Sequence, residues 1–159
     1  MLCPNVAIPH LIIMCYLLDI DYFYTMISIP SHIKNILFDF GGVIINLNIQ
    51  ASVEAFMKLC GPNATISFDQ WSKYGVEPAF ERGELSPEEF CDQMRRLLDN
   101  PVSDQQIHDA WNAMILDLPE YRMEALESLR KKYRIFLLSN TSQIHYDLYT
   151  KQFSERYGY

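Results

Sequence analysis

The sequence lacks the long apolar runs and the charge pattern that direct proteins to membranes. It contains no uninterrupted apolar stretch of the roughly 20 residues that a bilayer-spanning helix needs. The run from Leu11 to Leu18 is much shorter and ends at Asp19. No lysine or arginine precedes Lys34, so the positive charges of a secretory signal or of an amphipathic membrane anchor are missing as well. We therefore expect no membrane contact.

Basic clusters and paired cysteines are also missing. The formal net charge is -7, and no cluster of lysines or arginines interrupts this acidic balance, which argues against a nucleic-acid-binding surface. The four cysteines, at positions 3, 15, 60 and 91, have neither metal-ligand nor redox spacing and form no disulfide framework. We interpret them as reduced thiols and expect a cytoplasmic protein.

The composition is that of an ordinary globular protein. Hydrophobic residues make up 49% and charged residues 21% of the 159 positions, with no internal repeat. This length fits one domain, or one small core plus an insertion. Residues 1–30 are predicted to be an extension that is either non-native or poorly ordered, with Met26 as an alternative start. An intact mass of the natural product that included Met1 would contradict this hypothesis.

The most informative segment is an apolar run that ends in an aspartate and two glycines. Residues 36–38 (Ile-Leu-Phe) predict a strand buried on both faces, as in a parallel sheet. Asp39 follows at the carboxyl end, where open α/β sheets bind ligands. A carboxylate there can coordinate a metal ion or attack an electrophile, or it can simply form a turn. The other motifs of a protein kinase do not accompany this Asp-Phe-Gly, so we reject that interpretation.

Helical signals dominate between this strand and a second one. Ser86 and Ser103 each begin a capping box that is followed by apolar residues at helical spacing. We expect further helices over residues 51–60, from Pro119 to about Tyr133, and after Ser142. Residues 134–138 predict a second buried strand. The order of strand, helical stretch, strand and helix indicates an α/β fold in which the two strands are neighbours and parallel.

A second candidate site directly follows the second strand. Ser139, Asn140 and Thr141 precede the last expected helix, and the N-terminus of a helix suits phosphate because of its free N–H groups. The alternative interpretation is that Ser139 or Thr141 merely caps that helix. Because two parallel strands would deliver polar groups to one edge, the presence of Asp39 favours a site.

These segments together resemble the haloacid dehalogenase-like (HAD) hydrolase superfamily. The resemblance rests on Leu-Phe-Asp-Phe-Gly-Gly-Val, a helical insertion and then Leu-Leu-Ser-Asn-Thr, and it covers about residues 33–153. It is strongest for the branch with a helical cap, which includes glucose-1-phosphatase-like enzymes. The resemblance implies a partial Rossmann-like parallel sheet with an inserted helical cap. The HAD-like core would comprise residues 31–48 and 116–159, and the cap residues 49–115.

The resemblance also implies a phosphatase that acts on a small phosphorylated metabolite through an aspartyl-phosphate, with Mg2+ as cofactor. Asp39 matches the nucleophile and a metal ligand, and the carbonyl of Gly41 matches the backbone metal ligand. Ser139 and Asn140 match the phosphate-binding second motif. Phe40 and Gly41 are expected to contact the phosphate as well.

Two departures from the family pattern carry consequences. Most phosphatases of the family have a second aspartate where this sequence has Gly41, although the Asp-Phe-Gly-Gly branch also has glycine there. The lysine of the third motif and the acidic pair of the fourth have no counterpart after Thr141. We therefore expect a chain that stops within the catalytic core, binds Mg2+ weakly and turns over little substrate. Residues 36–38 would expose an apolar edge, unless the N-terminal apolar segment covers it.

Three interpretations therefore stay open. The chain is a member or fragment of a Mg2+-dependent phosphatase family, a non-catalytic α/β module that binds a partner through its helical cap, or an incomplete gene product. We adopt the first for the ancestry of the chain, while the absent side chain at Gly41 and the missing motifs favour the second as the alternative. A further strand with Lys-Pro and Asp-Asp beyond Tyr159 in the reading frame would restore the first.

Overall fold

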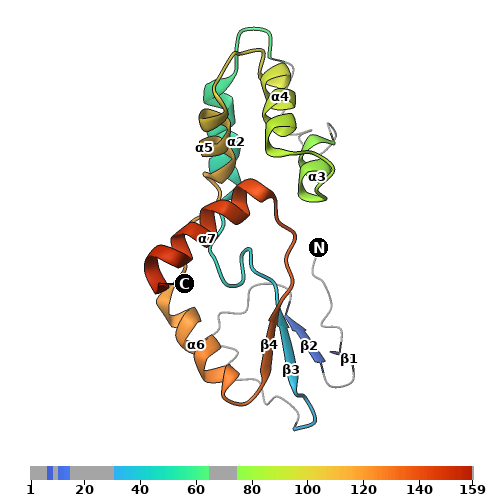
Figure 1. Ribbon diagram of the computed structural model, residues 1–159, viewed down its shortest axis with the longest axis vertical. Helices are drawn as coiled ribbons and strands as arrows, with labels where there is room; N and C mark the ends of the chain where they lie inside the picture. The colour runs from blue at the N-terminus through green and yellow to red at the C-terminus, as the bar shows by residue number, and fades with distance from the viewer. Residues whose placement is uncertain (1–6, 9–10, 15–30, 65–74, 159) are drawn as a thin grey trace. The chain divides into compact units, whose positions relative to one another are not determined.

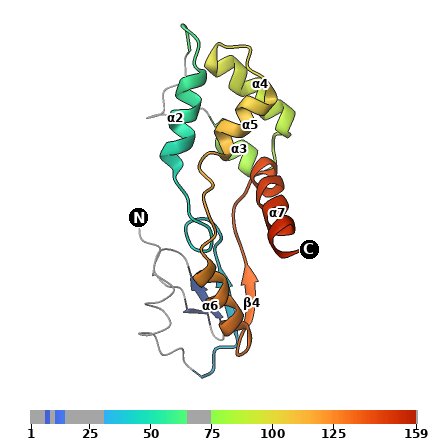
Figure 2. The ribbon, with the colours of Figure 1, turned by 90° about the vertical axis from the view of Figure 1, so that its left-hand side faces the viewer.

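The computed structural model describes residues 7–8, 11–14, 31–64 and 75–158. Contacts between residues divide the chain into two compact units, which can be followed in Figures 1 and 2. The sheet unit comprises Met1–Leu47 and Leu116–Ser139, and the helical unit comprises Asn48–Ile115 and Asn140–Tyr159. The chain therefore passes between the two units at three points.

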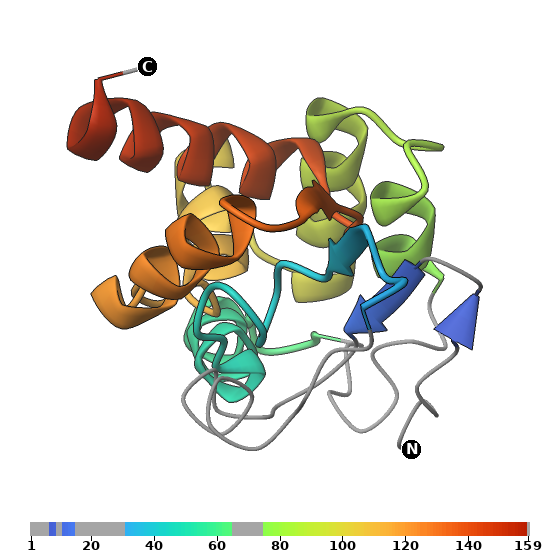
Figure 3. The same ribbon diagram turned by 90° about the horizontal axis from the view of Figure 1, so that it is seen from below.

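The sheet unit is built on four strands in the order β1-β2-β3-β4, which Figure 3 shows from below. The strands span Ala7–Ile8 (β1), Leu11–Met14 (β2), Asn35–Phe38 (β3) and Arg134–Leu137 (β4). β3 pairs in parallel with β2 and with β4, and β1 pairs antiparallel with β2. The predicted parallel pairing of the two strands that precede the candidate motifs is confirmed.

β3 packs into the core of the sheet unit through alternate residues. Ile36 and Phe38 are 0% and 1% exposed, whereas Asn35 and Leu37 are partly exposed. Full burial of an aliphatic or aromatic side chain of this size stabilises a fold by about 1.5–3 kcal/mol. The expected strand is confirmed, with one face fully buried and the other covered in part.

A segment from the N-terminal region covers the edge of β3 that β4 leaves open. β2 runs parallel to β3, with Ile12 opposite Ile36 and Met14 opposite Phe38. The N-terminal apolar segment therefore does pair with this edge, and the backbone of β3 has a partner strand on each side. Met26 and most of the other residues of the expected extension lie outside the described part of the chain.

The prediction that the second strand is buried is wrong. β4 is an edge strand, and Phe136, Leu137 and Leu138 are 49%, 55% and 68% exposed. A parallel strand becomes buried only when strands flank it and helices cover both faces of the sheet. Within the described residues β4 has β3 alone as a neighbouring strand, which explains its exposure.

α6 (Glu120–Arg130) lies beside β4 in the sheet unit (Figure 2). The helix follows Pro119 as predicted, and Leu129 is its buried residue. Nη1 of Arg122 donates a hydrogen bond to the carbonyl oxygen of Ile44 at 3.2 Å, which connects α6 to the loop after β3. The helix therefore supports the segment that follows Asp39.

The helical unit contains five described helices, and the sequence marks the beginnings of two of them. The helices are α2 (Ile49–Leu59), α3 (Val76–Glu81), α4 (Pro87–Leu98), α5 (Asp104–Asn112) and α7 (Gln143–Tyr157). Both predicted capping boxes are confirmed, with Ser86 paired to Glu89 and Ser103 paired to Gln106. Within the described residues, no helix is long and apolar enough to cross a bilayer.

Three aromatic rings form the centre of the helical unit. Phe80 of α3 stacks on Phe90 of α4 with ring centroids 4.3 Å apart, and Trp111 of α5 lies 5.1 Å from Phe90. All three side chains are at most 2% exposed. Such aromatic pairs contribute about 0.5–1.5 kcal/mol beyond the burial of their area. This cluster joins helices that are separated in the sequence.

α7 is attached to α5 through the same tryptophan. The indole Nε1 of Trp111 donates to Oγ of Ser142 at 2.9 Å, and the ring of His145 stacks on the indole at 4.9 Å. The carbonyl oxygen of Trp111 lies 3.1 Å from Nε2 of His145, which therefore carries the proton and donates. These contacts explain why Asn140–Tyr159 groups with the helical unit, whereas the sequence-based division assigned 116–159 to the core. The division otherwise stays a prediction.

Ser52 connects α2 to α5 from within the core. Its hydroxyl donates to the carbonyl oxygen of Trp111 at 2.9 Å and accepts from the N–H of Met114 at 3.0 Å. The residue is 3% exposed, so these bonds satisfy backbone groups near the C-terminus of α5 that water does not reach. Ser52, a polar residue on the buried face of α2, therefore stabilises the packing of α2 against α5.

Candidate active site

Asp39 comes directly after β3, and its side chain is partly exposed. One carboxylate oxygen, Oδ1, accepts a hydrogen bond from the backbone N–H of Phe40 at 2.6 Å. Within the described residues no other hydrogen bond or ion pair engages this carboxylate, so Oδ2 is open to a ligand. The aspartate makes the local contact of a turn and keeps one oxygen for chemistry.

The backbone after Asp39 folds into a tight loop. The N–H groups of residues 43–45 all donate to the carbonyl oxygen of Phe40, at distances of 2.8–3.3 Å. The N–H of Gly42 donates to the carbonyl oxygen of Ile45 at 2.8 Å. Gly42 has a φ of 72°, in the left-handed region that favours glycine. The paired glycines predicted such a turn, and the structure confirms it.

Gly41 fills a position where a side chain would collide with a neighbour. A Cβ added to Gly41 would lie 2.8 Å from Cδ1 of Leu47. The N–H and C=O groups of Gly41 make no hydrogen bond within the described part of the chain. Its carbonyl therefore supplies a second free oxygen, two residues after the carboxylate of Asp39, and hard oxygen donors of this kind suit Mg2+.

Ser139 follows β4 as Asp39 follows β3. Phe38 lies opposite Leu137, and the N–H of Leu138 donates to the carbonyl oxygen of Phe38 at 2.9 Å. The pairing therefore continues to the point where the chain leaves the sheet. Asp39 and Ser139 emerge at the same edge, one residue apart in register, and both are partly exposed.

The alternative role for Ser139 or Thr141 was to cap the last helix, and another residue provides that cap. Ser142 precedes α7, and its Oγ accepts a hydrogen bond from the N–H of His145 at 3.4 Å. The first turn of α7 is thus capped by Ser142, as one sequence expectation had it, and neither Ser139 nor Thr141 is the cap. Asn140 is exposed and begins the returning segment of the helical unit.

The structure thus places most of the predicted site residues in one unit. Asp39, Phe40 and Gly41 form one loop, Ser139 follows the neighbouring strand, and Asn140 belongs to the other unit. In the described ranges, no three histidine, cysteine, aspartate or glutamate side chains gather where a metal ion could bind. The catalytic and binding roles of these residues stay predictions. Among them, the groups suited to bind a metal ion are the carboxylate of Asp39 and the carbonyl of Gly41.

Two titratable residues of the helical unit were not singled out from the sequence. Burial raises the pKa of the Glu81 carboxyl. The pKa of His145 is lowered. Burial lowers it and is the larger effect, while the hydrogen bond to the Trp111 carbonyl raises it. The sequence offered no local signal for Glu81, because charged residues commonly follow core residues in helices, as the exposed Arg130 follows the buried Leu129.

A curated relative matches most of this chain. The D-ribitol-5-phosphate phosphatase of Bacteroides thetaiotaomicron is 34% identical over 110 residues, which are 69% of this chain and 53% of the relative. No family model matches the sequence.

Solved structures give a second, independent comparison. The crystal structure of a HAD family enzyme from Bacteroides thetaiotaomicron matches with a TM-score of 0.68 and 40% identity, over 74% of this chain and 58% of that one. Over about three quarters of its length, this chain is therefore similar to enzymes of the HAD family. Another structure of that enzyme holds magnesium and inorganic phosphate, with a TM-score of 0.67, 39% identity and the same shares of both chains. A predicted HAD-like hydrolase from Porphyromonas gingivalis matches with a TM-score of 0.63 and 32% identity, over 72% and 55% of the two chains.

These comparisons confirm the HAD resemblance and the partial α/β fold that it implied. The chain spans about half the length of the relatives that it matches, from 53% to 58%. The matched HAD chains are therefore considerably longer than the part of the fold described above.

Proposed function

We propose that this chain carries the nucleophile of a Mg2+-dependent phosphatase site for small phosphorylated metabolites. The observation that carries the proposal is Oδ2 of Asp39, which has no partner among the described residues and lies at the carboxyl end of a parallel strand, beside the loop of Gly41 and level with Ser139. The names of the relatives support it, because one is a D-ribitol-5-phosphate phosphatase and another was solved with magnesium and phosphate. The proposed substrate is a phosphomonoester of this general kind.

The proposed reaction has two displacement steps. In the first, Oδ2 of Asp39 attacks phosphorus, the bond between phosphorus and the ester oxygen breaks, and the alcohol leaves with a proton from water. In the second, water attacks phosphorus, inorganic phosphate leaves and the carboxylate is restored. The hydrogen bond from the N–H of Phe40 holds Oδ1 and so orients Oδ2 toward the substrate. Ser139 would hold a phosphoryl oxygen through its hydroxyl.

The donor atoms of this loop fit Mg2+ in chemical type. Asp39 and the carbonyl of Gly41 would hold the ion, with water and phosphate oxygens in the remaining positions, since Mg2+ is usually bound through one or two carboxylates. The bound ion would offset the repulsion between the carboxylate and an anionic substrate. With two protein ligands we expect weak binding.

The leaving group decides how fast the first step can be. Gly41 has no side chain, so it cannot serve as a general acid, and such help is typically worth 10²–10⁴-fold in rate. An aryl phosphate, whose leaving group needs no proton, is therefore the sharpest probe. Turnover of alkyl phosphates by this chain alone is expected to be very low.

A single-turnover experiment tests the proposal. The full chain is incubated with Mg2+ and an aryl phosphate, quenched in acid, and digested for mass spectrometry. We expect one phosphoryl group on the peptide that contains Asp39, dependent on Mg2+ and absent in Asp39→Asn. Asp109→Asn is a matched control, because Asp109 is an exposed carboxylate of the helical unit. A phosphoryl group elsewhere, or none at all, would contradict the proposal.

The compartment also remains part of this proposal. Cys60 and Cys91 are both free thiols, which is typical of a reducing environment. We propose a cytoplasmic protein that acts on a dissolved metabolite, and labelling of its thiols in intact cells tests this placement.

A further inference from the structure

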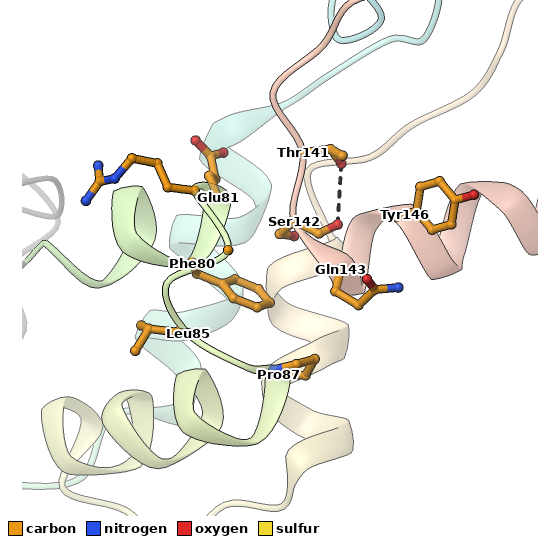
Figure 4. A pocket seen from close by; sticks show the side chains of 10 residues that line it. Phe80, Glu81, Leu85, Pro87, Thr141, Ser142, Gln143 and Tyr146 are labelled. Carbon is orange, nitrogen blue, oxygen red and sulfur yellow. Dashed lines mark hydrogen bonds between the residues drawn. The ribbon is translucent and has the colours of Figure 1, made fainter.

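The helical unit contains a pocket of about 510 Å³, a volume within the usual range for small-molecule sites (Figure 4). One wall consists of the end of α3 and the turn that leads to α4. The other wall consists of the first turn of α7 with the residue before its cap. All of these segments belong to one compact unit. The pocket is therefore a feature of the helical unit alone.

The α3 wall combines a fixed apolar surface with a carboxylate. Figure 4 shows the side chain of Glu81 on one side of the Phe80 ring and that of Leu85 on the other. Phe80 is 2% exposed and stacks on Phe90, so the aromatic core fixes its ring. Leu85 is partly exposed at the edge of this core. A short hydrocarbon chain can pack against such a surface.

The carboxylate of Glu81 has no partner in the described part of the chain. The residue ends α3 and is partly buried, and burial raises the pKa of its carboxyl. No hydrogen bond or ion pair with another described residue engages it. A partly buried charge without hydrogen bonds is unfavourable. A ligand that brings both a positive charge and N–H donors would therefore be favoured beside it.

The other charges near the pocket select against different kinds of ligand. Arg82 binds Glu84 through two hydrogen bonds, from Nε at 2.6 Å and from Nη2 at 2.9 Å. The positive charge of Arg82 is therefore matched, and the charge of Glu81 would repel an anion. Among the described residues no three side chains gather that could hold a metal ion, and one carboxylate is too little for such a site. The pocket suits a cation that carries its own hydrogen-bond donors.

The α7 wall adds an aromatic ring. Tyr146 lies one turn after the cap of α7 and is 49% exposed, and its phenol oxygen makes no hydrogen bond with another described residue. The start of this wall is fixed, because Oγ of the buried Ser142 accepts from Nε1 of Trp111 and from the N–H of His145. Aromatic rings attract ammonium groups, and a phenol oxygen can accept an N–H bond. Both walls therefore favour a positively charged ligand.

We propose that this pocket binds an organic ammonium ion, in which a protonated amine is attached to a short carbon chain. The ammonium group donates hydrogen bonds to the carboxylate of Glu81, and the carbon chain packs against Phe80 and Leu85. Tyr146 contacts the ligand from the α7 side. This ligand is not the phosphorylated substrate, because Glu81 would repel a phosphate group. The inference therefore does not rest on the proposed function.

Binding of the amine should stabilise the helical unit. The ligand contacts two walls that exist only in the folded unit, so it shifts the equilibrium away from unfolded or opened states. Amides that exchange only when the pocket opens should exchange about tenfold more slowly at a ligand concentration of about ten times the dissociation constant. The pocket thus couples the occupancy of a small cation to the stability of α3 and α7.

Titration with a simple amine tests the inference. n-Butylammonium is added to the full 15N-labelled chain at neutral pH, and n-butanol, which has the same carbon chain without the charge, is the control. We expect saturable shifts of the amide signals of Gly83, Gln143 and Tyr146 with butylammonium alone. Shifts that do not saturate, shifts confined to residues outside the pocket, or equal binding of butanol would each overturn the inference.

Two variants test the role of the carboxylate. In Glu81→Gln the affinity for butylammonium should fall about tenfold, because hydrogen bonds to a charged group are the stronger ones. Glu54→Gln is the matched control, since Glu54 is an exposed glutamate on α2, and its affinity should equal that of the wild type. The dispersion of the remaining amide signals shows that each variant is folded.

The same pair of variants separates a site from a diffuse attraction. The chain has a formal net charge of -7, so any cation is drawn weakly to its surface. A diffuse attraction would weaken equally in Glu81→Gln and Glu54→Gln, and that result would overturn the inference.

The test is separable from that of the phosphatase reaction. Asp39 belongs to the sheet unit, so Asp39→Asn should bind butylammonium with the affinity of the wild type. A loss of amine binding in Asp39→Asn would overturn the assignment to this pocket. Failure of amine binding in the wild type would overturn the inference and leave the proposed phosphorylation of Asp39 intact.

Discussion

The helical unit and the sheet unit contain similar apolar residues and differ in how completely they bury them. Leu98 of α4 is 0% exposed, whereas Leu137 of β4 is 55% exposed. Helices satisfy their backbone internally and need only one covered face, while a parallel strand needs a neighbour on each side and cover on both faces. The helical unit therefore completes a core from its own segments, and the strand that follows the insertion does not.

The largest loss of stability is expected for a substitution at the centre of the helical unit. Trp111→Ala removes the indole that contacts Phe90, His145 and Ser142, and we expect a loss of about 3–5 kcal/mol of stability. Hydrogen exchange of α5 amides measures the loss, because a chain with two units has no single unfolding transition. An unchanged exchange rate would contradict the central role of Trp111.

A matched pair of leucines compares the two units directly. Leu98→Ala should destabilise the helical unit by about 2–5 kcal/mol, and Leu137→Ala should change the stability of the sheet unit by less than about 0.5 kcal/mol. Exchange of amides in α4 and β3 reports on each unit separately. Equal losses at the two sites would show that β4 is buried in solution, by another copy or by another segment.

A smaller effect is expected for the serine that connects α2 to α5. Ser52→Ala leaves the carbonyl oxygen of Trp111 and the N–H of Met114 without this partner, which should cost about 1–3 kcal/mol. Ser128→Ala is the control, because Ser128 is a partly exposed residue of α6 in the sheet unit. Hydrogen exchange of α5 amides measures both variants, and the rates should be unchanged in Ser128→Ala.

The smallest effect is a dependence on pH that is confined to the helical unit. Burial holds the pKa of His145 in the folded chain below its ordinary value of 6.5, so the unfolded chain binds more protons as the pH falls through this value. Stability should therefore be highest above pH 6.5 and decrease below it, until the pH reaches the folded pKa. Exchange of α7 amides at several pH values measures this slope.

A conservative variant checks the origin of that slope. His145→Gln should flatten the pH dependence below 6.5, whereas His32→Gln should preserve it because His32 belongs to the sheet unit and the exchange is measured in α7. A slope that persists in His145→Gln would assign the dependence to other groups.

Local signals predicted the elements that carry the candidate site. The capping boxes at Ser86 and Ser103, the strand before Asp39 and the turn at Gly42 all depend on contacts between residues close together in the sequence. Such contacts leave a pattern that can be recognised without a structure. The place of Asp39 at the end of a parallel strand was therefore predictable.

Other features depend on residues that are far apart in the sequence. The pairing of β2 with β3, the exposure of Leu137 and the bond from Trp111 to Ser142 each join segments that no local pattern relates. The surroundings of the Glu81 carboxyl belong to this group as well, since they come from α3 and from the start of α7. The burial of a side chain is set by what packs on it from elsewhere in the chain.

The sequence by itself predicted the parallel strands and the position of the candidate nucleophile, because periodicity, capping and turn chemistry are local, and its two motifs carried the resemblance to the HAD family. The tertiary structure alone decided which oxygen of Asp39 accepts the N–H of Phe40, that α7 joins the helical unit, and that β4 is left at an edge. These outcomes are set by packing and hydrogen bonds between distant segments. Whether two distant segments make such a contact depends on which of their surfaces other segments of the chain already cover.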